Sequence, residues 1–174
     1  MFLSFQRFFN FGVDFGSMNY RHTIEYQLFD NRLSLSIDDA ELVDAAESAM
    51  ANAYAPYSGF SVGAALRLSN GSVVRGSNQE NIAYPSGLCA ERVALFYAGS
   101  AFPDEHVETL CIVAQGDLIP ESQLLSPCGG CRQVMSETER RQNRPFRVIL
   151  VNQDGRVLIF NSAHDLLPLA FGSI

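Results

Sequence analysis

Hydrophobic and polar residues alternate with two different periods along the chain, and these periods predict the order of its helices and strands. In segment 36–52 the apolar residues recur three or four positions apart behind Ser36-Ile37-Asp38-Asp39, which is typical of a capped helix. Segments 60–66 and 72–76 are rich in residues that favour strands. They are joined through Asn70-Gly71, a dipeptide favoured in tight hairpins.

The rest of the chain continues this mixture of both periods. The order of elements is therefore α-β-β-α-β-α-β-β-α, which predicts an α/β fold with a mixed five-stranded sheet and helices on both faces. The further elements are a helix from about Cys89, a strand around Cys111, a helix at 129–140, strands at 146–151 and 157–160, and a short helix at 163–166.

The length and the charge of the chain limit the kinds of molecule that it is expected to bind. At 174 residues the chain fits one domain with a sizeable core. Its formal net charge of -7 would repel a polyanion, and the nearest basic cluster, Arg140, Arg141 and Arg144, is interleaved with Glu137 and Glu139. No apolar run approaches the roughly 20 residues that span a bilayer. We therefore expect a small soluble ligand, no nucleic acid and no membrane.

The first thirty residues differ from the remainder. They contain many aromatic residues, but up to Met18 the only cation is Arg7, and no small-residue cleavage pattern follows, so a signal peptide or a surface anchor is disfavoured. We expect residues 1–30 to be a disordered extension, or the product of a start assigned too early with Met18 as the initiator.

Four cysteines without an export signal favour a reducing compartment, and hence the cytoplasm.

Two short motifs carry the chemistry. They are Cys89-Ala90-Glu91 and Pro127-Cys128-Gly129-Gly130-Cys131. Three thiolates can hold one zinc ion and leave a coordination position for water, and the pattern is that of the nucleobase deaminases. Two other interpretations of the cysteines are disfavoured. A redox Cys-x-x-Cys needs neither a third cysteine nor a glutamate, and a structural zinc site requires a fourth protein ligand. Cys111 lies in an apolar run and is interpreted as a core residue.

This constellation predicts a hydrolase that removes an amino group from a ring. Zinc lowers the pKa of a coordinated water toward about 7. Glu91 is placed to take the proton of that water and to pass it to the ring nitrogen and then to the leaving amine. Three thiolates on a dication leave a net negative charge, which a guanidinium from Arg92 would offset. From the residues alone, a surface role for Arg92 is equally compatible.

Several ordered motifs resemble the small homotetrameric cytidine deaminases. The resemblance covers about residue 38 to the C-terminus. It implies deamination of cytidine or 2′-deoxycytidine, one zinc per subunit, a three-layer α/β/α sandwich, a catalytic domain at 31–174, and a homotetramer whose active sites are shared between subunits. The motifs are Ala55 to Ala65, Asn78 to Arg92, Ser126 to Gln133 and Leu166 to Phe171.

The resemblance also assigns roles to individual residues. Cys89, Cys128 and Cys131 correspond to the zinc ligands, Glu91 to the proton shuttle and Arg92 to the residue that tempers the thiolates. Other residues correspond to contacts with the nucleoside or a neighbouring subunit: Asn78 and Glu80 with the ribose, Phe60 and the Ala90 backbone with the base, and Phe171 and Tyr84 at the shared interface. Two positions depart from the family pattern. Gln79 replaces an aliphatic residue, and Gly130 replaces a common alanine.

Two alternatives stay open at this point. One is a deaminase of another aminated ring, such as a nucleoside antibiotic, although the Asn-x-Glu pair argues against a free base. The other is a catalytically silent zinc protein that serves as an assembly subunit. Glu91 is the residue that such a protein would most plausibly lack, and Glu91 is present. A deoxycytidylate deaminase would need cations for the phosphate, which an acidic chain does not offer.

Overall fold

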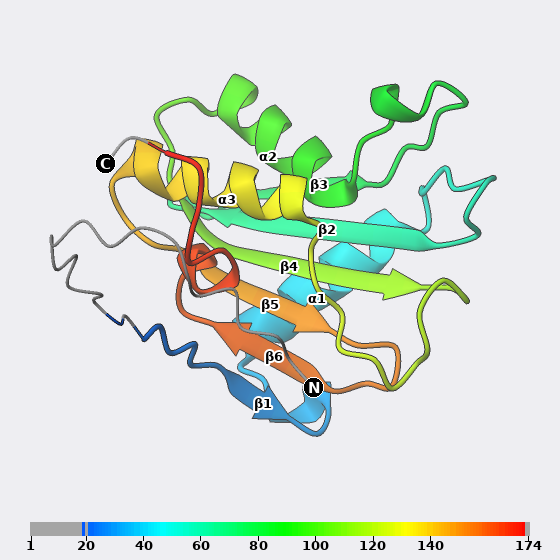
Figure 1. Ribbon diagram of the computed structural model, residues 1–174, viewed down its shortest axis with the longest axis horizontal. Coiled ribbons are helices and arrows are strands. Elements are labelled where there is room, and N and C mark those ends of the chain that lie inside the picture. The colour runs from blue at the N-terminus through cyan, green and yellow to red at the C-terminus, as the bar shows by residue number, and fades with distance from the viewer. Residues whose placement is uncertain (1–18, 20, 173–174) are drawn as a thin grey trace, which may run out of the picture.

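The computed structural model describes residues 19 and 21–172, which form one mixed sheet between helical layers. Helix α1 covers one face of the sheet, and helices α2 and α3 cover the other (Figure 1). The three-layer α/β/α sandwich is therefore confirmed. The elements are β1 (Gln27–Phe29), α1 (Ile37–Met50), β2 (Ser61–Leu68), β3 (Val73–Ser77), α2 (Ala90–Ala101), β4 (Val107–Gln115), α3 (Gly129–Gln142), β5 (Arg147–Val151) and β6 (Val157–Phe160), with three short 3-10 helices, η1 (Arg32–Ser34), η2 (Tyr84–Ser86) and η3 (Ala163–Leu166).

The sheet has the strand order β1-β6-β5-β4-β2-β3. Only β4 and β5 run parallel, and α3 forms the crossover between them. The side chains of β4 alternate between two cores. Leu110 and Ile112 pack under α2 and α3, whereas Cys111 and Val113 pack under α1. The prediction that Cys111 is a core residue is confirmed, since it is fully buried and burial raises the pKa of its thiol.

The sheet has six strands, one more than the sequence pattern predicts. The additional strand, β1, lies within the predicted extension and pairs antiparallel with β6, with Phe29 opposite Val157. Arg32 follows β1 and forms ion pairs with Asp44 and Glu47 of α1. Residues 1–18 of the extension, including Met18, lie outside the described residues.

Two glycines let the helices approach the sheet closely. A Cβ at Gly63 would lie 2.0 Å from the backbone oxygen of Ala46 in α1. A Cβ at Gly76 would lie 2.6 Å from the backbone oxygen of Ala90 in α2. Side chains at these two positions would push the helices outward. Gly76 therefore sets the position of the first turn of α2.

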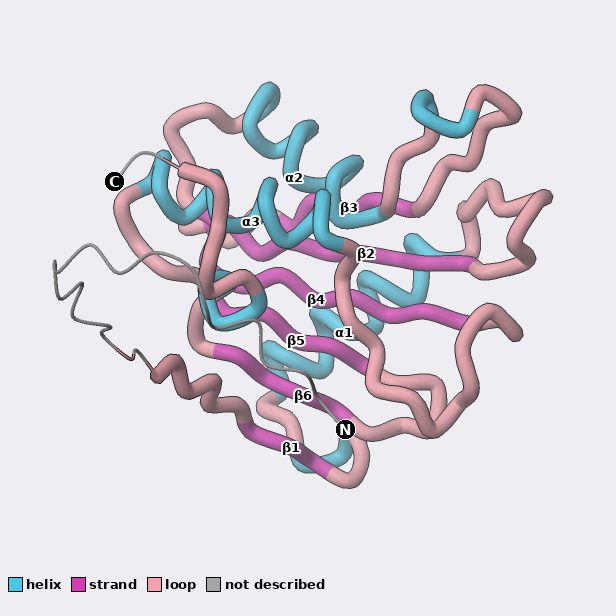
Figure 2. The backbone as a smooth tube through the Cα atoms, in the orientation of Figure 1, coloured by secondary structure: helices cyan, strands magenta, loops and turns pink. Residues whose placement is uncertain are grey.

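The loops that carry the sequence motifs gather at one end of the sheet. β2 begins where β4 ends, with Ser61 paired to Gln115. The loop before β2, the loop after β3 and the loop after β4 therefore emerge side by side (Figure 2). Among the described residues, none of the helices has the length and apolar character that crossing a bilayer would require.

Candidate active site

Three cysteine sulfurs converge at the start of two helices. Cys89 is the N-cap of α2 and Cys128 is the N-cap of α3, as the sequence predicts, while Cys131 lies in the first turn of α3. Their Sγ atoms all lie within 4.8 Å of one another. The Cys89–Cys128 separation is 3.8 Å and the Cys128–Cys131 separation is 3.5 Å. Thiols this close, with all four cysteines of the chain free, form a donor set that fits one tetrahedral zinc with a position left open.

The electrostatics of the cluster favour deprotonated sulfur. A hydrogen bond with Cys131 and the guanidinium of Arg92 lower the pKa of the Cys89 thiol to about 5. Cys131 is the partner in that hydrogen bond, and its pKa is raised. The surroundings of Cys89 therefore favour its thiolate form. A dication would displace the remaining protons on binding.

Glu91 lies beside the cysteines in the first turn of α2. Its side chain is buried, with 4% of the residue exposed. Burial raises the pKa of the Glu91 carboxyl to about 7, and the negative charge of Cys89 acts in the same direction. A carboxyl group with such a pKa both accepts and donates protons near neutral pH. This behaviour distinguishes Glu91 from an ordinary solvated glutamate at a helix start.

Arg92 is directed at the sulfur cluster. Its Nη2 lies 3.7 Å from Cys89 Sγ, within hydrogen-bonding distance of the sulfur. Its Nε atom is buried and has no hydrogen-bond partner within the described part of the chain. The geometry therefore disfavours a surface role for Arg92, the reading that the residues alone leave open.

The turn before α3 is held by Arg132. Its Nε donates to the backbone oxygen of Pro127 at 2.9 Å and its Nη2 donates to Ser126 Oγ at 2.6 Å. Upstream, the buried Asn152 accepts the backbone N–H of Leu125 at 2.7 Å. The cysteine turn is thus fixed from both sides. Sequence reasoning missed both contacts, because Asn152 is far away in the chain and Arg132 resembles an ordinary helical arginine.

Asn78 and Glu80 support the loop before β2. Asn78 accepts from the backbone N–H of Val62 and donates to the backbone oxygen of Phe60, both at 2.8 Å. Glu80 accepts from the backbone N–H of Tyr57 at 2.8 Å. Hydrogen bonds from the Ser58 side chain and the loop backbone hold the pKa of the Glu80 carboxyl below its ordinary value. Each side chain keeps further hydrogen-bonding capacity, since an amide has two N–H groups and a carboxylate several lone pairs.

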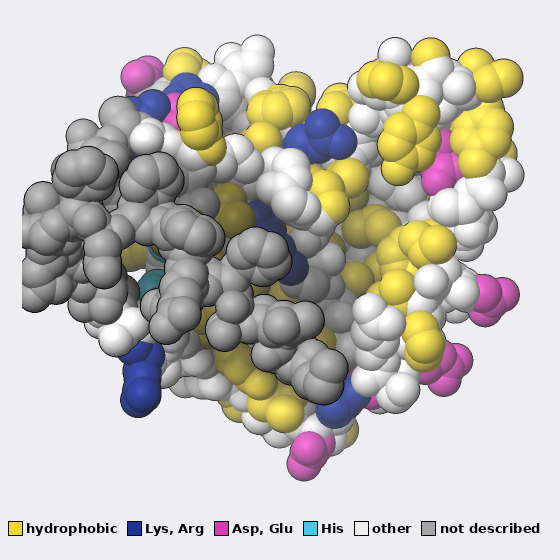
Figure 3. Space-filling model, viewed as in Figure 1, with side chains coloured by type: hydrophobic (Ala, Val, Ile, Leu, Met, Phe, Trp, Pro, Cys, Tyr) yellow, Lys and Arg dark blue, Asp and Glu magenta, His cyan; other side chains and the backbone are white. Residues whose placement is uncertain are grey.

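The remaining predicted residues have contrasting exposures. Phe60 is buried at the edge of the core under α2 and α3, and Ala90 is fully buried at the start of α2. Tyr84 and Phe171, the two predicted interface residues, are each 90% exposed. Figure 3 shows hydrophobic side chains gathered over the loops at this end of the molecule. The exposed large apolar residues of these loops are Tyr54, Tyr57, Ile82, Tyr84, Leu118 and Leu124.

Gln79, which departs from the family pattern, has a defined place in the structure. Its Nε2 donates to Ser77 Oγ at 3.1 Å and to the backbone oxygen of Asn52 at 3.3 Å. These contacts tie the Asn78–Glu80 segment to the end of α1. The substitution thus provides polar packing for the loop and leaves both neighbouring side chains in place.

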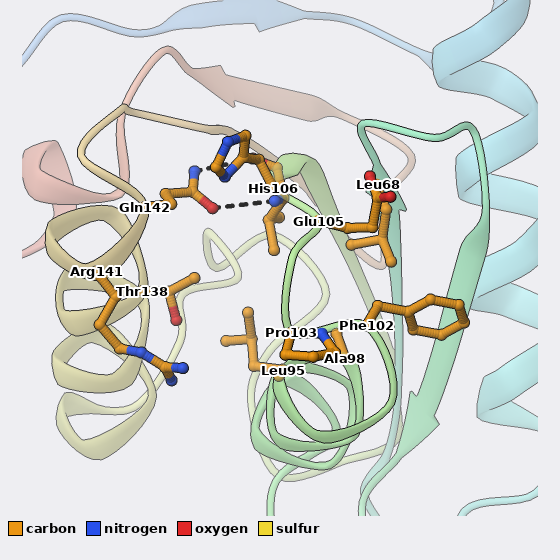
Figure 4. A pocket seen from close by; sticks show the side chains of 12 residues that line it. Leu68, Leu95, Ala98, Phe102, Pro103, Glu105, His106, Thr138, Arg141 and Gln142 are labelled. Atoms are coloured by element: carbon orange, nitrogen blue, oxygen red, sulfur yellow. Dashed lines mark hydrogen bonds between the residues drawn. The ribbon is translucent and has the colours of Figure 1, made fainter.

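A small cavity lies away from this cluster. It has a volume of about 140 Å³ between the carboxyl-terminal halves of α2 and α3, where Ala98, Thr138 and Arg141 line it (Figure 4). The cysteines lie at the opposite ends of the same helices. None of the predicted site residues lines this cavity, so it is separate from the candidate active site.

Comparisons with known proteins agree with this geometry. A protein-family model described as the cytidine and deoxycytidylate deaminase zinc-binding region matches residues 36–159. The cytidine deaminase of Halalkalibacterium halodurans is 38% identical over 135 residues, which cover 78% of this chain and 95% of that protein. The crystal structure of cytidine deaminase from Burkholderia pseudomallei is similar with a TM-score of 0.64 and 40% identity, covering 75% of this chain and 97% of that one.

A more distant relative is a deaminase of a nucleoside antibiotic, which is the first of the two alternatives that the sequence leaves open. The blasticidin-S deaminase of Bacillus cereus is 28% identical over 143 residues, which cover 79% of this chain and 95% of that protein. The family match, which includes the cysteine cluster, together with the relatives above, confirms the predicted fold, the zinc cofactor and the deaminase class. The chain belongs to the family of zinc-dependent cytidine and deoxycytidylate deaminases.

Proposed function

We propose that the protein deaminates cytidine and 2′-deoxycytidine by hydrolysis, giving the uridine counterpart and ammonia, as a step in pyrimidine salvage. The observation that carries this proposal is the cluster of three cysteine sulfurs within 4.8 Å of one another beside the buried Glu91. Cys89, Cys128 and Cys131 would hold the zinc. When bound, the zinc would lower the pKa of a water molecule, so that a hydroxide nucleophile would be available near neutral pH.

Glu91 is the proton shuttle in this reaction. A C–O bond forms at the amine-bearing carbon of the ring, and the C–N bond to the amine breaks. Glu91 takes one proton from the attacking water and delivers it to the ring nitrogen. It then passes the second proton of that oxygen to the amine, which leaves as ammonia while the carbonyl forms. A pKa of about 7 supports this role, because the carboxyl must act first as a base and then as an acid.

The nucleoside is recognised by the loops at the same end of the sheet. Phe60 packs on the pyrimidine, and the backbone of Ala90 binds its polar edge. Asn78 and Glu80 bind the ribose hydroxyls with the capacity that their loop contacts leave free. A substrate without the sugar would leave these groups unpaired, which penalises the free base.

The assembly is a homotetramer with active sites shared between subunits. Exposed apolar side chains on the loops and at Leu169 and Phe171 support this, because single copies rarely expose so many large apolar residues near one site. Phe171 reaches the site of a neighbouring subunit, and Tyr84 lines the shared interface. The reducing cytoplasm suits the free thiols. Residues 31–174 form the catalytic domain, and residues 1–30 form an extension that contributes β1.

The first experiment is ammonia release from cytidine by the zinc-loaded protein, with Glu91→Ala alongside. We expect Glu91→Ala to retain zinc and to lose at least about a thousandfold in rate, because the shuttle serves more than one proton transfer. Near-normal turnover in this variant would contradict the mechanism. Activity on blasticidin S without activity on cytidine would identify an antibiotic deaminase, and no activity with zinc bound would favour a silent assembly subunit.

A further inference from the structure

Two consecutive side chains of α3 hold the C-terminal segment, residues 166–171. The amide of Gln133 binds both backbone groups of Phe171. Its Nε2 donates to the Phe171 carbonyl oxygen at 2.6 Å, and its Oε1 accepts the Phe171 N–H at 2.9 Å. Arg132 donates through Nη1 to the backbone oxygen of Leu166 at 3.0 Å. The segment is therefore fixed at both of its ends by one turn of helix.

The same turn carries the metal ligands. Gln133 lies two residues after Cys131, and Arg132 is also bound to Pro127, immediately before Cys128. The position of the C-terminal segment thus depends directly on the part of α3 that presents the two cysteines. No other side chain among the described residues makes a hydrogen bond to Phe171.

The backbone of Phe171 is held in place, whereas its side chain is exposed. Its backbone is pinned by two hydrogen bonds, while the residue is 90% exposed. An aromatic ring on a fixed backbone loses little conformational freedom when another molecule covers it. A segment without these hydrogen bonds would have to be ordered when the partner binds, at a cost in conformational entropy.

We propose that Gln133 is a positioning residue that holds the backbone of Phe171 so that its ring enters the substrate site of a neighbouring subunit. This inference rests on the proposed function, in which Phe171 completes that site. Gln133 touches neither substrate nor metal in this role. It acts on the substrate through Phe171 alone, so the two residues are coupled.

The test compares zinc-loaded, full-length Gln133→Ala, Phe171→Ala and the double variant with the wild type. Glu137→Ala is the matched control, because Glu137 lies on the same helix and its side chain bonds to Arg140 instead of the C-terminal segment. The readouts are KM and kcat for cytidine, zinc content, and hydrogen exchange of the Phe171 amide. Gln133→Glu keeps the acceptor and removes the donor to the Phe171 carbonyl.

We expect Gln133→Ala to raise KM by about tenfold with a much smaller change in kcat and an unchanged zinc content. The double variant should be no worse than Phe171→Ala, since coupled residues are not additive. Exchange of the Phe171 amide should be faster in Gln133→Ala, and Gln133→Glu should also raise KM. Glu137→Ala should match the wild type in every readout.

The outcomes separate the two proposals. If the wild type releases no ammonia from cytidine, the proposed function fails. If the wild type is active but Gln133→Ala leaves KM and Phe171 exchange unchanged, the positioning role of Gln133 is overturned and the proposed function stands. An additive double variant would also overturn it, because Gln133 would then act independently of Phe171.

Discussion

Replacing Glu139 with alanine removes one carboxylate that joins three segments of the chain. Glu139 lies in α3 with 3% of its surface exposed. Its Oε1 accepts the backbone N–H groups of Phe146 and Ala163, each at 2.8 Å. Its Oε2 accepts hydrogen bonds from the Ser162 hydroxyl at 2.9 Å and from the backbone N–H of His164 at 3.2 Å. The carboxylate thereby fixes the start of η3, which precedes the C-terminal segment.

The expected loss in the free energy of unfolding follows from the hydrogen-bond donors that lose their acceptor in the variant. Alanine would strand the buried backbone N–H groups of Phe146 and Ala163, and each buried donor without a partner costs about 1–3 kcal/mol. The N–H of His164 would keep its second acceptor, Ser162 Oγ at 3.1 Å. Relief of the buried charge and entry of water offset part of that cost. We expect Glu139→Ala to lower the free energy of unfolding by about 2–4 kcal/mol, which is a large share of the roughly 5–15 kcal/mol typical of a domain.

The assay is urea unfolding of the wild type and the variant at one fixed protein concentration, since assembly makes stability depend on concentration. Glu137→Ala is the control, because Glu137 forms only an exposed ion pair with Arg140, and solvent-screened pairs of this kind contribute little to stability. If Glu139→Ala is destabilised by no more than Glu137→Ala, the carboxylate does not hold the three segments together and the reasoning fails.

Three further predictions concern the metal, the pH dependence and the packing of α2. Cys128→Ala should lose both zinc and activity, and stoichiometric zinc measured in that variant would contradict the ligand assignment. Desolvation acts to raise the pKa of Asp39, but two hydrogen bonds from Arg147, both at 2.9 Å, hold that pKa below its ordinary value. The ionised Asp39 therefore stabilises the fold above about pH 4, and this contribution is lost as the pH falls through the folded-state pKa. Asp39→Asn should therefore cost about 1 kcal/mol in unfolding free energy at pH 7, and the difference from the wild type should shrink below pH 4; a constant difference would exclude this linkage. Gly76→Ala should displace α2 and lower both thermal stability and zinc affinity, since the added Cβ would meet backbone atoms of Ala90 and Ala94 at 2.6 and 2.7 Å, and wild-type values of both would refute the close-packing argument.

The sequence predicts the elements whose residues carry a periodic signal. α1, the β2–β3 hairpin and the helices behind Cys89 and Cys128 all lie close to their predicted bounds. It also predicts the convergence of the three cysteines, because the two short motifs that contain them match the zinc-binding pattern of the deaminases. β1 is too short to show a period. Its strand conformation depends on pairing with β6, more than a hundred residues later, which no local pattern reveals.

Residues with tertiary partners are the ones that local patterns misjudge. Glu139 stands in a run of alternating charges that resembles a solvated helix face, yet it is buried because Phe146 and Ala163 bring their N–H groups to it. Gln133 equally resembles a surface glutamine until the C-terminal segment returns beside α3. Both side chains fix backbone groups of segments that precede or contain Phe171. The helix that presents two zinc ligands therefore also organises the C-terminal segment, and the metal site and the proposed subunit contact share one structural support.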